Sequence, residues 1–132
     1  MLQGGCLCGY IRYETHATPS DATSCHCGVC RRVQAAACVS WFTVPSGDFH
    51  LTGSEPTRFA SSEHATRSFC PRCGTALSFQ RNDTLQEIDI TTCSLDEPGH
   101  VPPRDQTHTR SKVAWVELDP KLPAFAEARS DG

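Results

Sequence analysis

The sequence predicts a single, mostly β domain built from short strands. Its 132 residues are enough for one hydrophobic core but not for two. Its apolar runs are short, rich in β-branched and aromatic residues, and separated by glycine and proline, a pattern that favours strands over helices. No run approaches the roughly 20 apolar residues of a membrane-spanning helix.

The strands are predicted in chain order from alternation and composition. Residues 10–14 alternate, with Ile11 and Tyr13 on one face. Residues 36–42 form an apolar run that ends shortly before a proline and a glycine. Further strands are predicted at residues 49–52, 57–60, 66–69, 76–80, 85–91 and 113–118. The last of these runs would close the sheet.

Helix signals are weak. Residues 29–37 allow a turn or two of helix, and residues 94–97 allow a short helix that stops before Pro98. Residues 97–104 contain three prolines and are predicted to be a surface loop. The chain is expected to fray after Pro123, particularly over residues 129–132.

The composition limits the class of protein. Lys and Arg number 12 against 15 Asp and Glu, and this balance argues against a nucleic-acid protein with a basic stripe. The first five residues contain neither the basic nor the apolar part of a secretion signal. We therefore expect a cytoplasmic protein without a nucleic-acid or membrane partner. In that compartment thiols stay reduced, so nine cysteines indicate metal binding or catalysis rather than disulfides.

Seven of the nine cysteines fall into three tight clusters, each with a glycine beside it. The clusters are Cys6 and Cys8, then Cys25, Cys27 and Cys30, then Cys70 and Cys73. Thiolates two or three positions apart can converge on one tetrahedral ion, and all-sulfur tetrahedral sites select zinc or iron–sulfur. Zinc fits this pattern best.

Seven ligands are one short of two complete tetrahedral sites. The simplest arrangement is one closed site, made by four cysteines, and one site with a vacancy, made by three. The closed set would be Cys6, Cys8, Cys70 and Cys73, and the open set would be Cys25, Cys27 and Cys30. The closed site would contribute folding free energy, because it does not exist in the unfolded chain.

An open three-thiolate site indicates binding of an external thiol. Three thiolates overcompensate a dication, so the ion is a modest Lewis acid for water but still accepts a fourth sulfur. A zinc deaminase is the rival interpretation, since it also uses a Pro-Cys-x-x-Cys element. That signature needs a glutamate two residues after a ligand, and here Cys25 is followed by His26 and Cys27.

With these motifs in place, the chain resembles the glutathione-dependent formaldehyde-activating enzyme family, which includes centromere protein V-like zinc proteins. The likeness spans about residues 3–125 of a single domain, leaving 126–132 as a tail, and it is looser after residue 95. The family often has a glycine near Ala35, where this chain departs from it. The motifs that carry the resemblance are residues 4–9 with Arg12 and Tyr13, residues 25–32, and residues 69–75.

The resemblance implies a fold of several small coiled antiparallel β-sheets organised around zinc. It implies two zinc ions per chain, with Cys6, Cys8, Cys70 and Cys73 as structural ligands and Cys25, Cys27 and Cys30 as catalytic ones. It also implies carbon–sulfur lyase activity, in which glutathione condenses with formaldehyde to S-hydroxymethylglutathione. The alternative is a non-catalytic zinc module, or a glutathione carrier, that binds a thiol metabolite or a protein partner.

Several residues near the clusters have two possible roles. Arg31 and Arg32 directly follow the open set and could grip the carboxylates of glutathione, or else stabilise the thiolates or lie on the surface. His26 is expected to point away from the ion, as a proton shuttle or in an outer or exposed role. His64 and His108 are candidate fourth ligands that nothing in the sequence places.

Five other residues have predicted roles. Cys38 is expected to be a small core residue within a strand, whereas Cys93 is a candidate to approach the open site. Trp41 and Trp115 are predicted to lie in the core or in a pocket wall. Asp96 is predicted to cap a turn. The sequence leaves the oligomeric state open.

Overall fold

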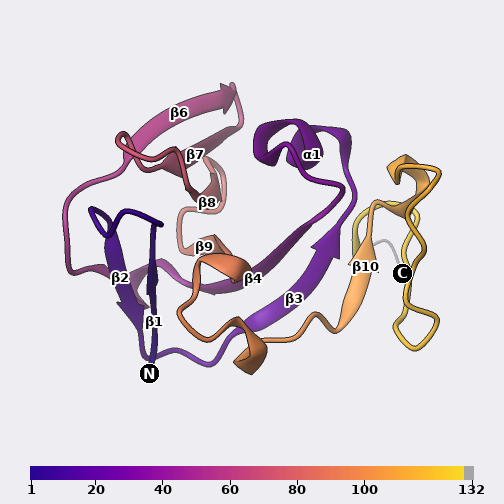
Figure 1. The fold of residues 1–132 in the computed structure, drawn as a ribbon, viewed down its shortest axis with the longest axis horizontal. Helices are drawn as coiled ribbons and strands as arrows, with labels where there is room; N and C mark the ends of the chain where they lie inside the picture. The colour runs from indigo at the N-terminus through magenta and orange to yellow at the C-terminus, as the bar shows by residue number, and fades with distance from the viewer. Residues whose placement is uncertain (130–132) are drawn as a thin grey trace.

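The computed structural model describes residues 1–129 as a mostly β domain with two sheets, which confirms the predicted fold class (Figure 1). The smaller sheet is antiparallel, in the order β1-β2-β5. Its strands are β1 (Leu2–Gly5), β2 (Arg12–Thr15) and β5 (Phe49–Leu51). Within the described residues, no helix is long and apolar enough to cross a membrane.

The larger sheet has seven strands in the order β10-β3-β4-β9-β8-β7-β6. β10 pairs with β3 in parallel, and all other neighbours are antiparallel. The strands are β3 (Ser20–Cys25), β4 (Val39–Pro45), β6 (Thr57–Ser62), β7 (Ala65–Phe69), β8 (Ala76–Arg81), β9 (Glu87–Thr91) and β10 (Asp105–Thr107).

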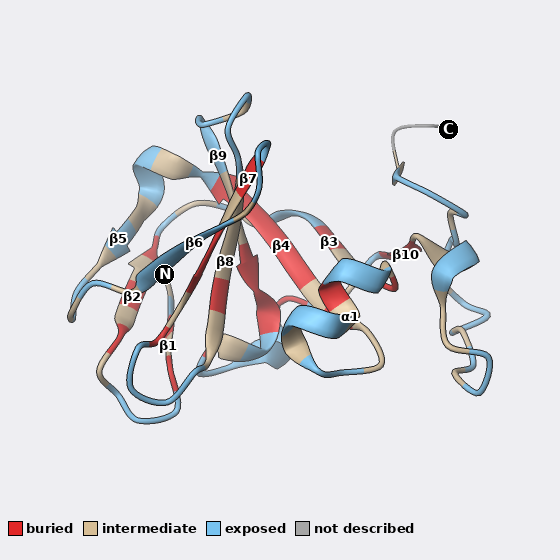
Figure 2. Ribbon diagram, turned by 90° about the horizontal axis from the view of Figure 1, so that it is seen from above, coloured by how far each residue is buried: buried red, intermediate tan, exposed pale blue. Residues whose placement is uncertain are grey.

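The two faces of strand β4 have different roles. Phe42 and Val44 are almost completely buried and belong to the main core, which also includes Tyr13 of the smaller sheet and Ile90 of β9. Trp41 alternates with them and packs in a separate cluster with cysteines. Figure 2 shows the buried residues concentrated along β3, β4, β7 and β8. One face of the larger sheet therefore builds the core and leaves the other for a site.

The single α-helix among the described residues, α1 (Gly28–Gln34), is short and largely exposed (Figure 2). Cys27 caps its N-terminus, and the Cys27 sulfur accepts a hydrogen bond from the Cys30 N–H. The helix ends at Ala35, whose φ of 51° lies in the left-handed region. Glycine adopts this conformation more easily than alanine, so Ala35 holds a backbone conformation that glycine would favour.

Short 3-10 turns connect the remaining elements. They are η1 (Ser46–Asp48), η2 (Thr92–Ser94), η3 (Pro98–His100) and η4 (Thr109–Ser111). The short helix predicted at residues 94–97 is not formed: η2 ends at Ser94, η3 begins at Pro98, and residues 95–97 between them are not helical. η3 lies in the proline-rich segment predicted as a surface loop, but Val101 of that segment is buried in the core.

The strand prediction is wrong at residues 113–118, which form turns and irregular structure. Trp115 there is 76% exposed, and the Lys112 ammonium group donates to the Val116 carbonyl at 3.0 Å. The parallel edge strand is β10 instead, a buried polar segment. The run at residues 36–42 also differs, because β4 begins only at Val39, after the chain turns away from α1.

The tail was expected to fray after Pro123, but the described part of it is docked. The guanidinium of Arg129 donates to the carboxylate of Asp105 in β10, and the His108 N–H donates to the Glu127 carbonyl at 2.9 Å. The expected fraying of residues 130–132 lies outside the described residues. The docked segment becomes a wall of the site described below.

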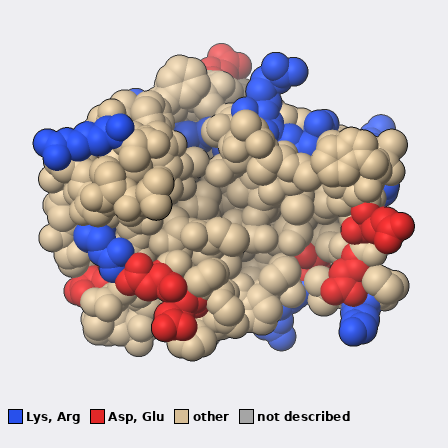
Figure 3. Space-filling model, in the orientation of Figure 1, with Lys and Arg blue, Asp and Glu red and all other residues tan. Residues whose placement is uncertain are grey.

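Charged side chains are dispersed on the face shown in Figure 3. Basic and acidic groups lie mainly toward the margins of this face, and its hollowed middle is largely uncharged. This distribution agrees with the nearly balanced composition, a net charge of −3.

Candidate metal centres

The first centre brings together four cysteines from two distant parts of the chain. The sulfur atoms of Cys6, Cys8, Cys70 and Cys73 all lie within 4.8 Å of one another. The sulfur of Cys8 is 3.6 Å from that of Cys6 and 3.7 Å from that of Cys70. Four thiolates about 2.3 Å from a tetrahedral zinc ion stand about 3.8 Å apart, so this donor set fits zinc.

The turns of this centre direct backbone N–H groups at sulfur. Ile11 N–H donates to the Cys6 sulfur at 3.2 Å, and the N–H groups of Arg72 and Cys73 donate to the Cys70 sulfur at 3.3 and 3.4 Å. Such donors favour the thiolate form that a metal requires. Hydrogen bonds from Thr75, together with other amide groups, lower the pKa of Cys73 to about 5.

Two glycines allow these turns to close. Gly9 and Gly74 have φ values of 84° and 81°, and each donates its N–H to the carbonyl of the first cysteine of its pair. Cys6 and Cys8 follow β1 of the smaller sheet, while Cys70 and Cys73 follow β7 of the larger one. A metal held by all four would therefore join the two sheets.

The second centre has three cysteines and is local in sequence. Cys25 ends β3, Cys27 caps α1, and Cys30 lies in the first turn of the helix. Their sulfurs lie within 4.8 Å of one another, a donor set that also fits zinc. Hydrogen bonds from Cys25 and Cys30 lower the pKa of Cys27 to about 2. The hydrogen bonds of Cys25 with Cys27 and Cys30 raise the pKa of Cys25. The geometry thus favours at least one thiolate before any metal binds.

The second centre opens into a cavity of about 370 Å³ on the face of the larger sheet that turns away from the core. One wall is aromatic, formed by Trp41 and Phe79, whose rings meet edge to face at 6.2 Å. The docked tail supplies another wall through Ala128 and Arg129. Polar groups of both charge signs complete the lining: Asp21, Glu87 and Asp89 on one side, and Arg67 on another.

Arg67 is the buried cation of this cavity. Arg67 is 7% exposed, and its guanidinium lies 4.8 Å from the ring centre of Phe79 and 5.9 Å from that of Trp41. Its terminal nitrogen is 3.9 Å from the sulfur of Cys30. These contacts fix the guanidinium beside the three-cysteine centre.

Asp89 lies at the other end of the same sheet face. Its carboxylate accepts a 2.6 Å hydrogen bond from the Thr43 hydroxyl. Burial raises the pKa of Asp89 above its ordinary value, and the Thr43 bond only partly offsets this effect. A carboxylate that is costly to ionise in a cavity wall is typical of functional sites.

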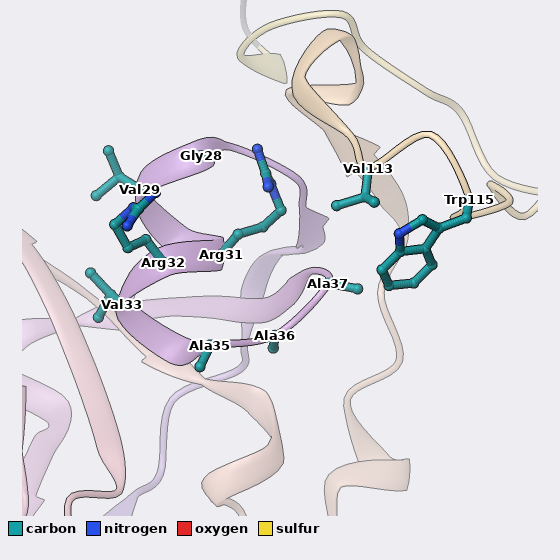
Figure 4. Close-up of a pocket in the computed structure, with 10 residues that line it drawn as sticks. All are labelled: Gly28, Val29, Arg31, Arg32, Val33, Ala35, Ala36, Ala37, Val113 and Trp115. Carbon is teal, nitrogen blue, oxygen red and sulfur yellow. The ribbon is translucent and has the colours of Figure 1, made fainter.

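Arg31 and Arg32 do not line this cavity. They border a different hollow of about 820 Å³ between α1 and the loop that carries Val113 and Trp115. Figure 4 shows the Arg31 side chain directed toward Val113 and Trp115, and Arg32 on the opposite side of the helix near Val29. Trp115 therefore borders a pocket rather than the core. A contact between either arginine and glutathione stays a prediction.

The candidate histidines lie in three different settings. His26 is buried, and its Nδ1 has no hydrogen-bond partner among the described residues. Burial and the charges of Lys112 and Arg31 lower the pKa of His26. His64 is exposed and 3.2 Å from Glu63. His108 lines the cavity but does not join the grouped sulfurs.

Three further predictions about single residues are corrected. Cys38 precedes β4 and is only half-buried, so it is not a core residue within a strand. Cys93 is exposed and borders a hollow beside Cys6 and Cys73, not the open centre. Asp96 accepts two hydrogen bonds from the Arg12 guanidinium, at 2.9 and 2.6 Å, in place of capping a turn.

Sequence reasoning missed the residues that shape the cavity. Arg67, Phe79 and Asp89 are separated in sequence, but register pairs Arg67 with Phe79 and Phe79 with Asp89. The row continues from Asp89 to Thr43 in β4. Directly opposite residues in antiparallel strands share a face, so these side chains gather only when the sheet forms. No local motif marks them in the sequence.

The family model for glutathione-dependent formaldehyde-activating enzymes matches residues 1–111. An uncharacterized lyase from Schizosaccharomyces pombe is 31% identical over 84 residues, which cover 58% of this chain. The matched region spans 56% of that relative, little more than half its length.

A solved structure shares the fold. The crystal structure of a Rhodobacter sphaeroides protein, a structural genomics target, is similar with a TM-score of 0.60 and covers 93% of this chain and 98% of that one. The two sequences are 19% identical, so this likeness concerns the fold alone.

Proposed function

The chain belongs to the glutathione-dependent formaldehyde-activating enzyme family, and on this premise we propose that it is a zinc-dependent enzyme of the carbon–sulfur lyase type. Its substrates would be glutathione, or another small thiol, and formaldehyde or a related small aldehyde. The product with the name-giving pair is S-hydroxymethylglutathione. We further propose two zinc ions per chain, one structural and one catalytic, and a cytoplasmic location.

The observation that supports this proposal is the difference in ligand number between the two centres. Four cysteines gather at the first, whereas three gather at the second, which opens into a cavity. Zinc, when bound there, lowers the pKa of a thiol that joins the three sulfurs and holds its sulfur in place. Cys25, Cys27 and Cys30 would hold the ion.

The cavity lining suits a small thiol with charged ends. Trp41 and Phe79 form an apolar wall beside the sulfurs, which limits access of water to the reacting atoms. Elsewhere in the cavity lining, Asp89 of β9 and Arg129 of the docked tail supply groups of opposite charge. In our proposal such groups bind the ammonium and carboxylate groups of glutathione. Holding thiol and aldehyde together is the main source of acceleration.

Metal analysis followed by exchange spectroscopy tests the proposal. Purified protein is expected to carry about two zinc ions per chain, and Cys27→Ser about one. Because formaldehyde reacts with glutathione unaided, the readout is the NMR exchange rate between glutathione and its hydroxymethyl adduct, with and without protein. A rate raised by wild type and not by Cys27→Ser supports the enzyme.

Two other results would replace the proposal. Glutathione binding without any acceleration would indicate a glutathione carrier. Neither binding nor acceleration, with both centres loaded, would indicate a non-catalytic zinc module.

A further inference from the structure

Arg67 is a buried cation without a carboxylate partner among residues 1–129. It makes no ion pair within 4.0 Å in the described part of the chain, and its Nε has no hydrogen-bond partner there. The nearest anionic group is the Cys30 sulfur, and its 3.9 Å contact compensates the charge only in part. Burying a guanidinium with so little compensation is costly, because the charge loses its hydration. The fold nevertheless holds it in a cavity wall, which indicates that an anion arriving from outside completes the site.

The position of Arg67 is fixed by its aromatic neighbours. Phe79 lies on the adjacent strand, directly opposite Arg67, and Trp41 lies two strands farther across the sheet. The guanidinium rests over both rings, which attract a cation through their faces. Among residues 1–129 its side chain has one polar contact, 3.9 Å from a terminal nitrogen to the Cys30 sulfur, which is long and uses one of five N–H donors. The Nε group is buried, so the remaining N–H groups of the two terminal nitrogens are the donors that a ligand could reach.

We propose that Arg67 donates hydrogen bonds to the oxygen of the aldehyde as the thiol adds to it, and so forms an oxyanion site beside the three-cysteine centre. This inference rests on the proposed function. The thiolate sulfur supplies the electron pair of the new C–S bond, and the C=O π pair moves onto the oxygen. The alkoxide then takes a proton from water, and the proton of the thiol has left to solvent. No oxidant or reductant is needed.

The number of bonds from the reacting sulfur favours the aldehyde oxygen, rather than a carboxylate of glutathione, as the hydrogen-bond acceptor of Arg67. The guanidinium lies beside the Cys30 sulfur, where a thiol joining the centre would lie. In the adduct the oxygen is one carbon away from that sulfur, whereas both carboxylates of glutathione are several bonds farther. A planar guanidinium held in a water-poor site stabilises developing negative charge without reorganising.

Substitution of Arg67 separates this role from a structural one. Arg67→Met keeps the apolar stem over the rings and removes all donors. We expect kcat/KM for formaldehyde to fall about 100-fold, the loss typical of a removed oxyanion donor. We expect the KM for glutathione to change less than about twofold and zinc to stay at about two per chain. Arg58→Met, an exposed charge change on β6, is the matched control and should leave all three values unchanged.

Two results would overturn the proposal. One is an Arg67→Met protein that turns over normally per bound zinc. The other is loss of zinc from the second centre in proportion to activity, which would make Arg67 a support of the thiolates. Arg67→Lys keeps the charge and serves if the methionine variant does not fold. Its single ammonium group should recover only part of the rate, because it lacks the planar fork.

A binding readout independent of turnover uses formate as the oxyanion probe. In a Trp115→Phe background, Trp41 is the remaining tryptophan and lies under the Arg67 guanidinium. Formate should change its fluorescence with saturation in zinc-loaded protein, and Arg67→Met should abolish the change. Saturation that persists in Arg67→Met overturns the inference. If the fluorescence change depends on Arg67 but the protein does not accelerate the aldehyde reaction, the anion-binding site is supported and the proposed function is rejected.

Discussion

The two cysteine centres differ in how much chain each one closes. The first joins Cys8 to Cys70 across 62 residues and ties the smaller sheet to the larger one. The second lies within residues 25–30, where a strand meets a helix. In the chain-entropy model of a cross-link, closing a 62-residue loop stabilises the fold by about 4 kcal/mol, against about 2 kcal/mol for a loop of this shorter kind.

The surroundings of the two centres also differ: the first lies among tight turns, and the second opens into a cavity. Backbone N–H groups from tight turns donate to sulfurs of the first, and its four sulfurs are enough for a complete tetrahedral site. The second has three ligands, a cavity, and a cation clamped beside it. The comparison teaches that one residue type can gather in a closed set of four sulfurs in one place and in a set of three beside a cavity in another.

Removing a ligand of the first centre should have the largest effect. Cys73→Ser is expected to lower the free energy of unfolding by about 4 kcal/mol or more, because the loss of a metal removes folding free energy directly. The melting temperature should fall by about 15 °C, as measured by circular dichroism. Cys93→Ser, an exposed thiol outside both centres, is the control and should melt like wild type.

Removing a ligand of the second centre should affect function far more than stability. In Cys27→Ser the serine oxygen can still cap α1, since serine is a preferred N-cap residue. We expect the free energy of unfolding to fall by about 2 kcal/mol or less. We also expect one zinc ion per chain and no acceleration of adduct formation. Thermal unfolding and metal analysis measure both effects. If this protein collapses as completely as Cys73→Ser, the division between the two centres is wrong.

The wall of the second centre should respond to pH through Asp105. Burial alone would raise the pKa of Asp105, but hydrogen bonds from Arg129 and Thr23 outweigh it and hold the pKa below its ordinary value. The ion pair therefore stabilises the fold above about pH 4 and ceases to do so as the pH falls through the folded-state pKa. Asp105→Asn should cost about 1 kcal/mol at pH 7.

The measurement is the difference in unfolding free energy between Asp105→Asn and wild type. Both proteins lose zinc in acid, so the effect of that loss cancels in the difference. This difference should vanish below the folded-state pKa of Asp105. Glu127→Gln removes an exposed ion pair of the same segment and is the control. If the difference in unfolding free energy stays constant from pH 7 to acid, the charge of Asp105 does not stabilise the docked tail.

Substitution of Asp89 should have an effect of similar size to that of Asp105 but of the opposite sign. Because burial raises the pKa of Asp89, its ionisation opposes folding as the pH rises from about 4 through the folded-state value. Asp89→Asn removes this cost and keeps an oxygen that can accept from Thr43. We expect the free energy of unfolding to rise by about 1 kcal/mol at pH 7 and to be unchanged in acid.

Denaturant unfolding at the two pH values measures this change, with Glu87→Gln on the same strand as the control. A destabilised Asp89→Asn protein at pH 7 would show that the fold itself needs the carboxylate. A stabilised one would support its retention in the cavity for function.

Much of the fold follows from local patterns, but some strands do not. The alternation around Ile11 and Tyr13 and the runs leading to β7, β8 and β9 predicted strands close to their observed bounds. β3 and β10 were missed because their sequences are polar, and they are stabilised by pairing with each other. Residues 113–118 look like a strand, but β10 already occupies the edge beside β3.

The sequence by itself determined the three local cysteine clusters, because cysteines two or three positions apart can reach one ion almost regardless of the rest of the chain. Counting ligands predicted their division into sets of four and three, and the fold brought the sulfurs of those two sets together. Only the tertiary structure decided what surrounds the open set. Arg67, Phe79 and Asp89 meet through strand register, and Arg129 arrives from the docked tail. Such contacts depend on pairing between distant segments, which the spacing of residues along one segment does not encode.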